Sequence, residues 1–351
     1  MRHAIIGSGF GIDVHLPVFL DLPFVDVVAV VDNGSGKASR LSLPGVSAYS
    51  DWRRMLEVEK VDSISVVVPP ASQAEIVLTA LERGIHVLCE KPLGNDISQA
   101  KEILCACRSA GVVGAVSLQY RYEAGVEEFR HAIIRQKIGK LLHIDFNWLT
   151  SGRSNPSREW CWQHDLSMGG GVLNGFVSHL ADLLYWLTGS ELQTVVGQTQ
   201  IQIANRLDPI VKTHRKVTAE DWVNAVTVLE SGVTSSLTAS NCHPTGLGFS
   251  VKAEGDSGIL QLIHRPPFNG DAELSFTGLD GYKILIPIHS THSNSDSRVI
   301  PFGKLAKRFV NAIHECAESE YLPRFEDGLR VQKFLDALRV SDKSRTKVFL
   351  R

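Results

Sequence analysis

The sequence predicts a doubly wound parallel α/β domain in residues 1–118, followed by an α+β domain with an open, mostly antiparallel sheet in residues 119–351. In the first third of the chain, short aliphatic runs alternate with stretches of helical spacing, which is typical of a parallel sheet covered by helices. A glycine-rich turn directly follows the first run. From residue 194 onward, strand-like runs are separated by turns rich in Gly, Asn and Asp, which indicates an α+β domain.

The elements of the first domain follow from hydrophobic periodicity and from the residues that end each run. Residues 63–68 are almost entirely aliphatic, as expected for a strand covered on both faces, and Pro69-Pro70 ends that run. Residues 73–83 carry apolar side chains at helical spacing and stop at Gly84, which suits a helix C-terminus. The predicted strands are 1–6, 25–31, 63–68, 86–89 and 112–118, and the predicted helices are 14–19, 52–56, 73–83 and 98–110.

The second domain begins with a helix and a strand whose alternating pattern predicts one solvent-exposed face. A long loop, residues 150–168, carries Arg153, Arg158, Trp160 and Trp162, and Gly169-Gly170-Gly171 then opens an apolar helix. The predicted helices are 124–135, 173–187, 302–319 and 327–341, and the predicted strands are 141–149, 194–203, 222–229, 234–240, 249–254, 259–263 and 273–276.

Composition excludes several classes of function. The formal net charge of −2 and the lack of a basic block argue against a nucleic-acid or membrane partner. No apolar run approaches the roughly 20 residues that span a bilayer, and no signal peptide is expected. The six cysteines lack disulfide or zinc spacing, and the pair His289 and His292 lacks a third ligand. We therefore expect reduced thiols, no metal site and a cytoplasmic location.

The first glycine-rich turn has the pattern of a dinucleotide site. Gly7 permits a tight turn after the first strand, Gly9 lets the backbone approach a pyrophosphate, and the helix that follows directs its dipole at the phosphates. Asp32 ends the second strand and would accept hydrogen bonds from a ribose. The sixth motif position is Ile12, since the third glycine has moved forward to Gly11. This pattern predicts a Rossmann domain.

Two further side chains could carry chemistry. Lys91 follows a strand within Glu90-Lys91-Pro92, at the sheet edge where ligands bind in open α/β folds. His179 lies in an apolar helix, and Asp182 shares its helical face and would either orient the imidazole or face a neighbour. The alternatives are a solvated surface lysine and a histidine that belongs to the core.

With these residues in place, the chain resembles the Gfo/Idh/MocA oxidoreductase family. The resemblance rests on the run from Gly7 to Pro17, on Val68-Pro-Pro, on the run from Val87 to Leu93 through Glu-Lys-Pro, and on Gly169-Gly-Gly followed by His179-x-x-Asp. The closing segment from Phe325 to Ser341 is also similar, so the resemblance spans nearly the whole chain.

The resemblance implies an NAD(P)-dependent dehydrogenase that acts on a hydroxyl or keto group of a sugar, cyclitol or sugar nucleotide. Lys91 would bridge the substrate and the nicotinamide, and His179 would take the hydroxyl proton. Asp32 favours NAD, although Lys37 and Arg40 leave NADP open, and a homodimer or homotetramer is expected. Cofactor contacts are expected from Gly7, Gly9, Phe10, Gly11, Ile12, Asp32, Pro69, Glu90, Lys91 and Gln119, and substrate contacts from Arg121, Arg158, Trp160, Gly175 and His179.

One position departs from the family pattern. Many members carry an aspartate four residues before the histidine, where this chain has Gly175. His179 would then act without that acid, a substitute would come from Tyr120, Tyr122 or Asp165, or activity would be lost. Gln73 stands where a histidine often follows the proline pair and could hydrogen-bond a ribose. A non-catalytic dinucleotide sensor and a redox-assisted NAD-dependent glycosidase therefore remain alternative functions.

Overall fold

The computed structural model describes all residues except 42, 267–271, 289–295, 316–320 and 351. The chain forms two compact units: Met1–Gln119 with Ser293–Gln332, and Tyr120–His292 with Lys333–Arg351. The described residues of Ser293–Gln332, which the sequence predicts to be part of the second domain, belong to the first unit.

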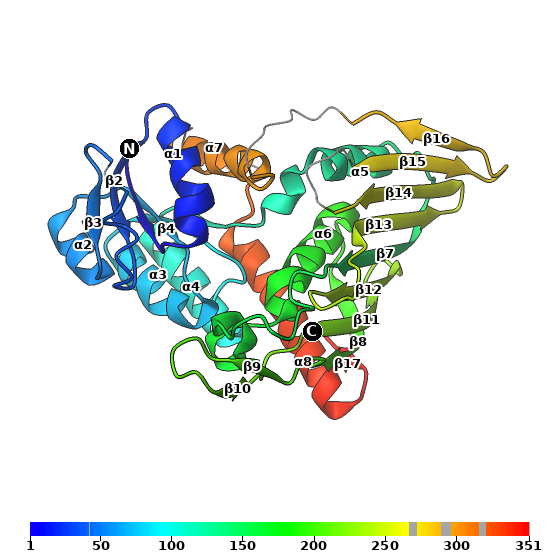
Figure 1. The fold of residues 1–351 in the computed structure, drawn as a ribbon. Helices are drawn as coiled ribbons and strands as arrows, with labels where there is room; N and C mark the ends of the chain where they lie inside the picture. Colours follow the sequence, from blue (N-terminus) through cyan, green and yellow to red (C-terminus); the bar gives the residue numbers. More distant parts are fainter. Residues whose placement is uncertain (42, 267–271, 289–295, 316–320, 351) are drawn as a thin grey trace. The chain divides into compact units, whose positions relative to one another are not determined.

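The first unit contains a six-stranded parallel sheet in the order β3-β2-β1-β4-β5-β6, which confirms the doubly wound arrangement (Figure 1). The short strand β3 was not predicted, because its three residues are exposed or half-buried and carry no apolar run. The strands are β1 (Arg2–Ile6), β2 (Asp26–Val31), β3 (Ser47–Tyr49), β4 (Ser63–Val66), β5 (His86–Cys89) and β6 (Gly114–Val116).

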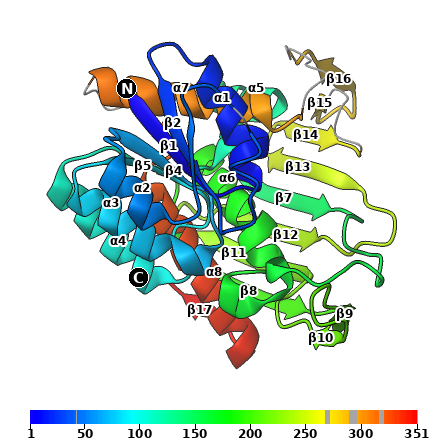
Figure 2. The same ribbon diagram turned by 60° about the vertical axis from the view of Figure 1, so that its left-hand side comes forward.

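The helices of the first unit begin and end where local chemistry favours it. Asp96 caps α4 by accepting a hydrogen bond from the Gln99 N–H at 2.9 Å, and Gly111 ends that helix in the left-handed conformation. Figure 2 shows α7 lying beside α1, two helices that are in contact. The elements are η1 (Gly11–His15), α1 (Leu16–Asp21), α2 (Trp52–Val58), η2 (Pro70–Ser72), α3 (Gln73–Glu82), α4 (Ile97–Ala110) and α7 (Val299–Glu315).

A polar group is buried in the middle of this sheet. His3, on β1, is fully buried, and its two ring nitrogens lie 2.8 Å from Ser63 Oγ and 3.0 Å from Ser65 Oγ on β4. Its ring stacks on Phe19 of α1 at a centroid distance of 3.9 Å. Burial, together with the neighbouring His15, lowers the pKa of His3 to about 3, so the imidazole is neutral at physiological pH.

The second unit contains a nine-stranded sheet in the order β16-β15-β14-β13-β7-β12-β11-β8-β17. Its neighbouring strands are antiparallel except for the parallel pair β7 and β12, which confirms the open, mostly antiparallel sheet. Strands β9 (Asn205–Leu207) and β10 (His214–Lys216) form a separate hairpin. The sheet strands are β7 (Leu141–Leu149), β8 (Leu192–Gln200), β11 (Trp222–Leu229), β12 (Thr234–Ser240), β13 (Gly248–Gly255), β14 (Gly258–His264), β15 (Glu273–Gly278), β16 (Lys283–Ile286) and β17 (Val348–Phe349).

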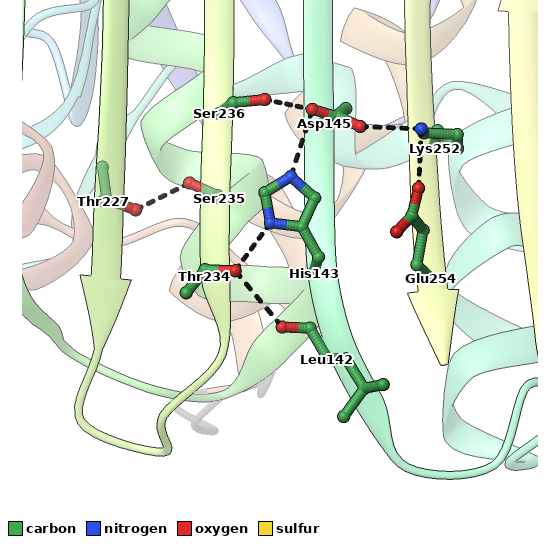
Figure 3. A network of polar contacts seen from close by, with 9 residues as sticks. All are labelled: Leu142, His143, Asp145, Thr227, Thr234, Ser235, Ser236, Lys252 and Glu254. Carbon is green, nitrogen blue, oxygen red and sulfur yellow. Dashed lines mark hydrogen bonds and ion pairs between the residues drawn. The ribbon is translucent and has the colours of Figure 1, made fainter. Parts of the chain in front are cut away.

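The two faces of this sheet differ in polarity. Along β7, Ile144, Phe146 and Trp148 are buried, whereas His143 and Asp145, which alternate with the first two, point to the other face. Figure 3 shows that Asp145 joins three strands there, because its carboxylate contacts Ser236 Oγ, lies 3.1 Å from His143 Nε2 and lies 3.0 Å from Lys252 Nζ. One face is thus part of the core and the other is polar.

The helices of the second unit include one that is almost wholly buried. Helix α6 follows the π-helical turn η6 directly, so the single predicted helix 173–187 is two joined elements, and Gly189 ends it. Helix α8 begins in the first unit and ends in the second. No described helix is long and apolar enough to cross a membrane. The elements are η3 (Gln119–Tyr122), α5 (Ala124–Ile134), η4 (Trp162–His164), η5 (Leu166–Met168), η6 (Leu173–Val177), α6 (Ser178–Thr188) and α8 (Phe325–Ser344).

The buried His3 predicts a specific loss of stability in acid. An unfolded histidine binds a proton with a pKa near 6.5, whereas folded His3 does so only near 3, so its stabilising contribution is present above pH 6.5 and is lost as the pH falls toward 3. Between pH 7.5 and 5, the free energy of unfolding of the wild type should fall by about 2 kcal/mol more than that of His3→Gln. Urea denaturation at both pH values measures this. Equal losses in the two proteins would show that His3 is protonated in the folded state.

Candidate functional site

The strongest candidate site in the first unit lies at the carboxyl edge of the parallel sheet. The Gly7 N–H donates to Val31 O at 2.8 Å, the Val67 N–H donates to Ile6 O at 2.7 Å, and the Glu90 N–H donates to Val66 O at 2.9 Å. The turns after β1, β4 and β5 are therefore neighbours at one edge. Ligands of open α/β sheets bind at this edge.

The three glycines of the first turn have different surroundings. Gly7 has φ +128°, and a Cβ there would overlap the carbonyl oxygen of Val67. A Cβ at Gly11 would lie 3.0 Å from Ile5 Cγ2. At Gly9, by contrast, a Cβ would meet no described atom within 4 Å. Gly7 and Gly11 allow close packing, whereas Gly9 leaves its backbone open, as the approach of a pyrophosphate requires.

Other predicted cofactor residues lie along the same edge. The Asp32 carboxylate accepts hydrogen bonds from Gly34 N at 2.8 Å and Ala38 N at 3.0 Å, and these bonds, the Ala38 bond most strongly, lower its pKa. Its charge is thus available to a ribose while it orders the loop that follows β2. Gln119 is buried, and its Oε1 has no hydrogen-bond partner among the described residues. This acceptor and the open backbone at Gly9 both fit a bound dinucleotide.

Glu90 holds the segment that carries Lys91. Its Oε1 lies 3.2 Å from His15 Nε2, and its Oε2 accepts from the Lys91 N–H at 3.3 Å. The amide of Gln73 donates to Glu90 O at 2.9 Å and accepts from the Gly94 N–H at 2.9 Å. Gln73, which the sequence offered as a possible ribose contact, is fully buried and braces this segment, so its contact with a ribose stays a prediction. The peptide bond between Lys91 and Pro92 is cis.

The environment of Lys91 changes its proton affinity. Burial lowers the pKa of Lys91 to about 8, although the nearby Glu90 carboxylate opposes the shift. A lysine with this pKa is mostly charged at neutral pH but releases its proton within reach of physiological conditions. This behaviour separates Lys91 from a solvated surface lysine.

In the second unit, His179 lies in an aromatic environment. Its ring centroid is 4.6 Å from that of Tyr120 and 5.9 Å from that of Trp148. Phe176, one turn earlier in the chain, stacks on Trp148 at 4.6 Å with an interplanar angle of 9°. These rings limit the orientations that the imidazole can take.

The structure pairs Asp182 with Arg121. The Arg121 Nε donates to Asp182 Oδ2 at 2.8 Å, Arg121 Nη2 contacts Asp182 Oδ1, and both side chains are buried. Of the two roles considered for Asp182, the observed contact is therefore with a neighbouring cation. Arg121 is held by the same ion pair, so its predicted role in substrate binding stays a prediction.

The backbone at Gly175, where the sequence lacks the expected aspartate, has room for a side chain. A Cβ at Gly175 would meet no described atom within 4 Å. The adjacent Asn174 accepts from Arg339 Nη2 at 2.6 Å and donates to Gly169 O at 3.0 Å. Among the predicted substitutes, Tyr120 lies beside His179, whereas Asp165 binds Arg215 Nη2 at 2.9 Å. Tyr122 is buried.

Two residues for which the sequence predicts no role make central contacts in the structure. His15 was part of the glycine-rich run, but only its contact with Glu90, 75 residues away, shows what it holds. Arg206 was not considered and is almost completely buried, with 1% of its surface exposed. A buried arginine has no periodic signal in a sequence, so neither contact was predictable from local pattern. Of the predicted loop residues, Arg158 is exposed, and Trp160 lies under the Arg215 guanidinium at 3.5 Å.

Comparison with known proteins places both units in one family. Residues 1–118 match the model of the Gfo/Idh/MocA oxidoreductase family, NAD-binding Rossmann fold, and residues 126–261 match the model of the Gfo/Idh/MocA C-terminal domain. The predicted resemblance and the predicted cofactor NAD are confirmed.

Curated relatives include several oxidoreductases. An uncharacterised oxidoreductase of Synechocystis is 26% identical, with 95% of this chain and 91% of the relative covered. Levoglucosan dehydrogenase of Pseudarthrobacter phenanthrenivorans is 26% identical over 53% of this chain and 50% of its own length. The scyllo-inositol 2-dehydrogenase (NAD+) of Bacillus subtilis is 23% identical over 72% and 71%.

Solved structures share the fold over the whole chain. An oxidoreductase domain protein from Kribbella flavida has a TM-score of 0.87 at 24% identity, covering 99% of this chain and 98% of its own. Levoglucosan dehydrogenase in complex with NADH and L-sorbose has a TM-score of 0.88 at 20% identity, covering 100% and 99%. At these identities the likeness establishes the fold.

The contrast between Gly7 and Gly9 predicts opposite effects of the same substitution. Gly7→Ala should lower the free energy of unfolding by about 2–4 kcal/mol, because its methyl group overlaps the backbone of Val67 at a strained φ. Gly9→Ala should change it by less than about 0.5 kcal/mol. Its affinity for NADH should nevertheless fall at least about tenfold, because the methyl group occupies the approach of the pyrophosphate. Urea denaturation and fluorescence titration with NADH measure the two quantities. Unchanged NADH affinity in Gly9→Ala would place the pyrophosphate elsewhere.

Proposed function

The chain belongs to the Gfo/Idh/MocA oxidoreductase family, and from this premise we propose that it transfers a hydride between NAD and a CH–OH or keto group of a sugar, cyclitol or sugar nucleotide. The observation that carries the proposal is Lys91, a half-buried lysine at the carboxyl edge of an NAD-binding Rossmann sheet, whose pKa burial lowers to about 8. A group of this kind can hold a substrate oxygen and stabilise negative charge on it.

Within the first unit, the residues around Lys91 have distinct tasks. Bound NAD supplies the hydride acceptor, or as NADH the hydride donor. The Lys91 ammonium donates a hydrogen bond to the substrate oxygen and stabilises its alkoxide character. Glu90, His15 and Gln73 are positioning residues, because their hydrogen bonds fix the backbone on both sides of Lys91.

In the second unit, His179 is proposed to act as the general base. A neutral imidazole takes the hydroxyl proton during oxidation and returns it during reduction. Tyr120 and Trp148 restrict the ring, which offsets part of what an adjacent carboxylate would contribute to orientation. Since residue 175 is a glycine, His179 is proposed to work without a carboxylate from that position.

The substrate class is supported by the names of curated relatives. They include levoglucosan dehydrogenase, D-glucoside 3-dehydrogenase of Escherichia coli and scyllo-inositol 2-dehydrogenase. Each acts on a sugar or polyol, and Trp160, Trp162 and Phe176 offer aromatic faces of the kind that pack against sugar rings.

Lys91→Ala should reduce kcat at least about a hundredfold, because the charge that stabilises the alkoxide is lost. The affinity for NADH should change little. Lys101→Ala, which removes an exposed lysine on α4, is the matched control and should keep wild-type kcat. Absorbance of NADH with a panel of sugars and polyols measures turnover. In the wild type, kcat/KM should decline above about pH 8 as Lys91 loses its proton. Wild-type turnover in Lys91→Ala would remove Lys91 from the mechanism.

Gly175→Asp tests whether His179 is the base. A carboxylate four residues before His179 lies on the same helical face and stabilises the imidazolium, so the acid limb of the kcat/KM profile should move to higher pH. Gly175→Ala also fits the open space and serves as the uncharged control, with an unchanged limb. Identical profiles in the two variants would argue that His179 does not accept the proton.

The alternative functions give different readouts in the same assays. Tight NADH binding without turnover of any sugar, polyol or sugar nucleotide would indicate a non-catalytic sensor, which the glycine at position 175 makes a coherent alternative. Release of reducing sugar without net NADH would indicate a redox-assisted glycosidase.

A further inference from the structure

Three arginines gather in the second unit, in the loop after β7 and on β9. Arg206 is the buried centre of the group. Its Nη1 donates to Asn155 O at 2.9 Å and to Arg158 O at 3.3 Å, and its Nη2 donates to Arg153 O at 2.5 Å. Arg206 therefore folds residues 153–158 around its guanidinium, and this loop carries Arg153 and Arg158.

The charge of this arginine cluster (Arg153, Arg158 and Arg206) is not neutralised locally. Among the residues that the structure describes, no carboxylate oxygen lies within 4.0 Å of the guanidinium nitrogens of these three arginines. The Arg153 guanidinium instead contacts Cys161 Sγ at 3.7 Å, His164 Nε2 at 3.1 Å and the Gln163 side-chain oxygen.

A neighbouring arginine in the same region, Arg215, is paired with two carboxylates. Arg215 lies 2.9 Å from Asp165 Oδ2 and 3.8 Å from Asp208 Oδ2. Among the described residues, carboxylates thus pair with Arg215, and none pairs with the arginine cluster. The charges of Arg158 and Arg206 act against that of Arg153, and an anionic ligand would offset this repulsion.

His164 cannot accept hydrogen bonds from both donors that point at its ring, and a bound anion would accept from one of them. Burial and the charges of Arg153, Arg206 and Arg158 lower the pKa of His164 to about 4, so the ring is neutral. A neutral imidazole has one acceptor nitrogen. Two donors point at the ring, Arg153 Nη1 at 3.1 Å from Nε2 and the Cys161 N–H at 3.0 Å from Nδ1. When Nδ1 accepts from Cys161, Arg153 Nη1 keeps, among the described residues, only the weak acceptor Cys161 Sγ at 3.7 Å.

We propose that Arg153 and Arg158 bind an anionic group of the substrate, a phosphate or a carboxylate, while Arg206 shapes the loop that presents them. Arg158 is exposed and Arg153 half-buried, so a small anion can reach both. Arginine suits these groups because its planar guanidinium binds two oxygens at once. The inference rests on the proposed function only for the identity of the rest of the substrate.

The cluster lies close in sequence to the proposed base. Trp148, the penultimate buried residue of β7, contacts the His179 ring, and Arg153 follows it by five residues. Five extended residues span at most about 18 Å, so both groups lie near the same end of β7. The substrate would therefore carry its reacting hydroxyl and its anion as separate groups, as in a sugar phosphate, a sugar nucleotide or a sugar acid.

Binding of inorganic phosphate tests the anion site without any turnover. The protein is first saturated with NAD, so that the glycine-rich turn is filled, and phosphate is then titrated by calorimetry. Arg153→Gln and Arg158→Gln should each weaken phosphate binding at least about tenfold, because each removes a charge-assisted contact. Arg345→Gln, at an exposed arginine paired with Asp342, is the matched control and should bind phosphate as the wild type does.

Turnover of matched sugars tests the substrate class and distinguishes the two anions. D-Glucose, D-glucose 6-phosphate and D-glucuronate are compared with NAD as co-substrate. The wild type should prefer one of the acidic sugars over glucose by at least about tenfold in kcat/KM, and this ratio should fall toward one in Arg158→Gln. A preference for the phosphate or for the carboxylate identifies which anion the site takes.

The outcomes separate this inference from the proposed function. If phosphate binds the wild type and both variants equally, or does not bind the wild type, the anion site is refuted. If neutral sugars are oxidised as well as acidic ones, the inference fails and the proposed function stands. If neither these three sugars nor the wider panel of sugars, polyols and sugar nucleotides is turned over but the variants lose phosphate binding, the anion site stands and the proposed function fails. Thermal unfolding of each variant checks the fold, and Arg153→Lys, which keeps the charge, replaces Arg153→Gln if that variant is unstable.

Discussion

The close approach of Gly7 to the carbonyl oxygen of Val67 is the constraint on which the candidate site depends. Because Gly7 has no Cβ, the turn after β1 can lie directly against the end of β4. The turn then leads into η1, which brings His15 to within 3.2 Å of Glu90 at the end of β5. The glycine at position 7 thus allows the ends of β1, β4 and β5 to lie close together. Hydrogen bonds from His15 and Gln73 to Glu90 hold the segment that carries Lys91.

The same unit shows how buried polarity is used at this sheet. His3 stays neutral between two serines inside the core, whereas Glu90 and Lys91 keep their ionisable groups at the edge. Burial lowers the pKa of both His3 and Lys91. At Lys91, the nearby Glu90 carboxylate opposes this shift. The position of a titratable group along a strand therefore decides whether it supports packing or is poised for chemistry.

In the second unit, charge and apolar surface are divided between neighbouring segments. Around His179 the contacts are aromatic, with Tyr120 and Trp148 against the imidazole. Arg206 orders the loop after β7, because its guanidinium donates hydrogen bonds to the carbonyl oxygens of Arg153, Asn155 and Arg158. A sugar ring suits the first environment and an anionic group the second.

The sequence alone determined the two sheet types, the order of most elements and the glycine-rich turn, and it singled out Lys91 and His179 as candidates, because periodicity and turn chemistry are local properties of the chain. Only the tertiary structure decided that Asp182 pairs with Arg121, 61 residues away, that Gln73 braces Glu90, and that Arg206 gathers a loop about 50 residues earlier. Such contacts depend on which segments the fold brings together. A side chain that is polar in sequence shows neither its burial nor its partner until the chain has folded.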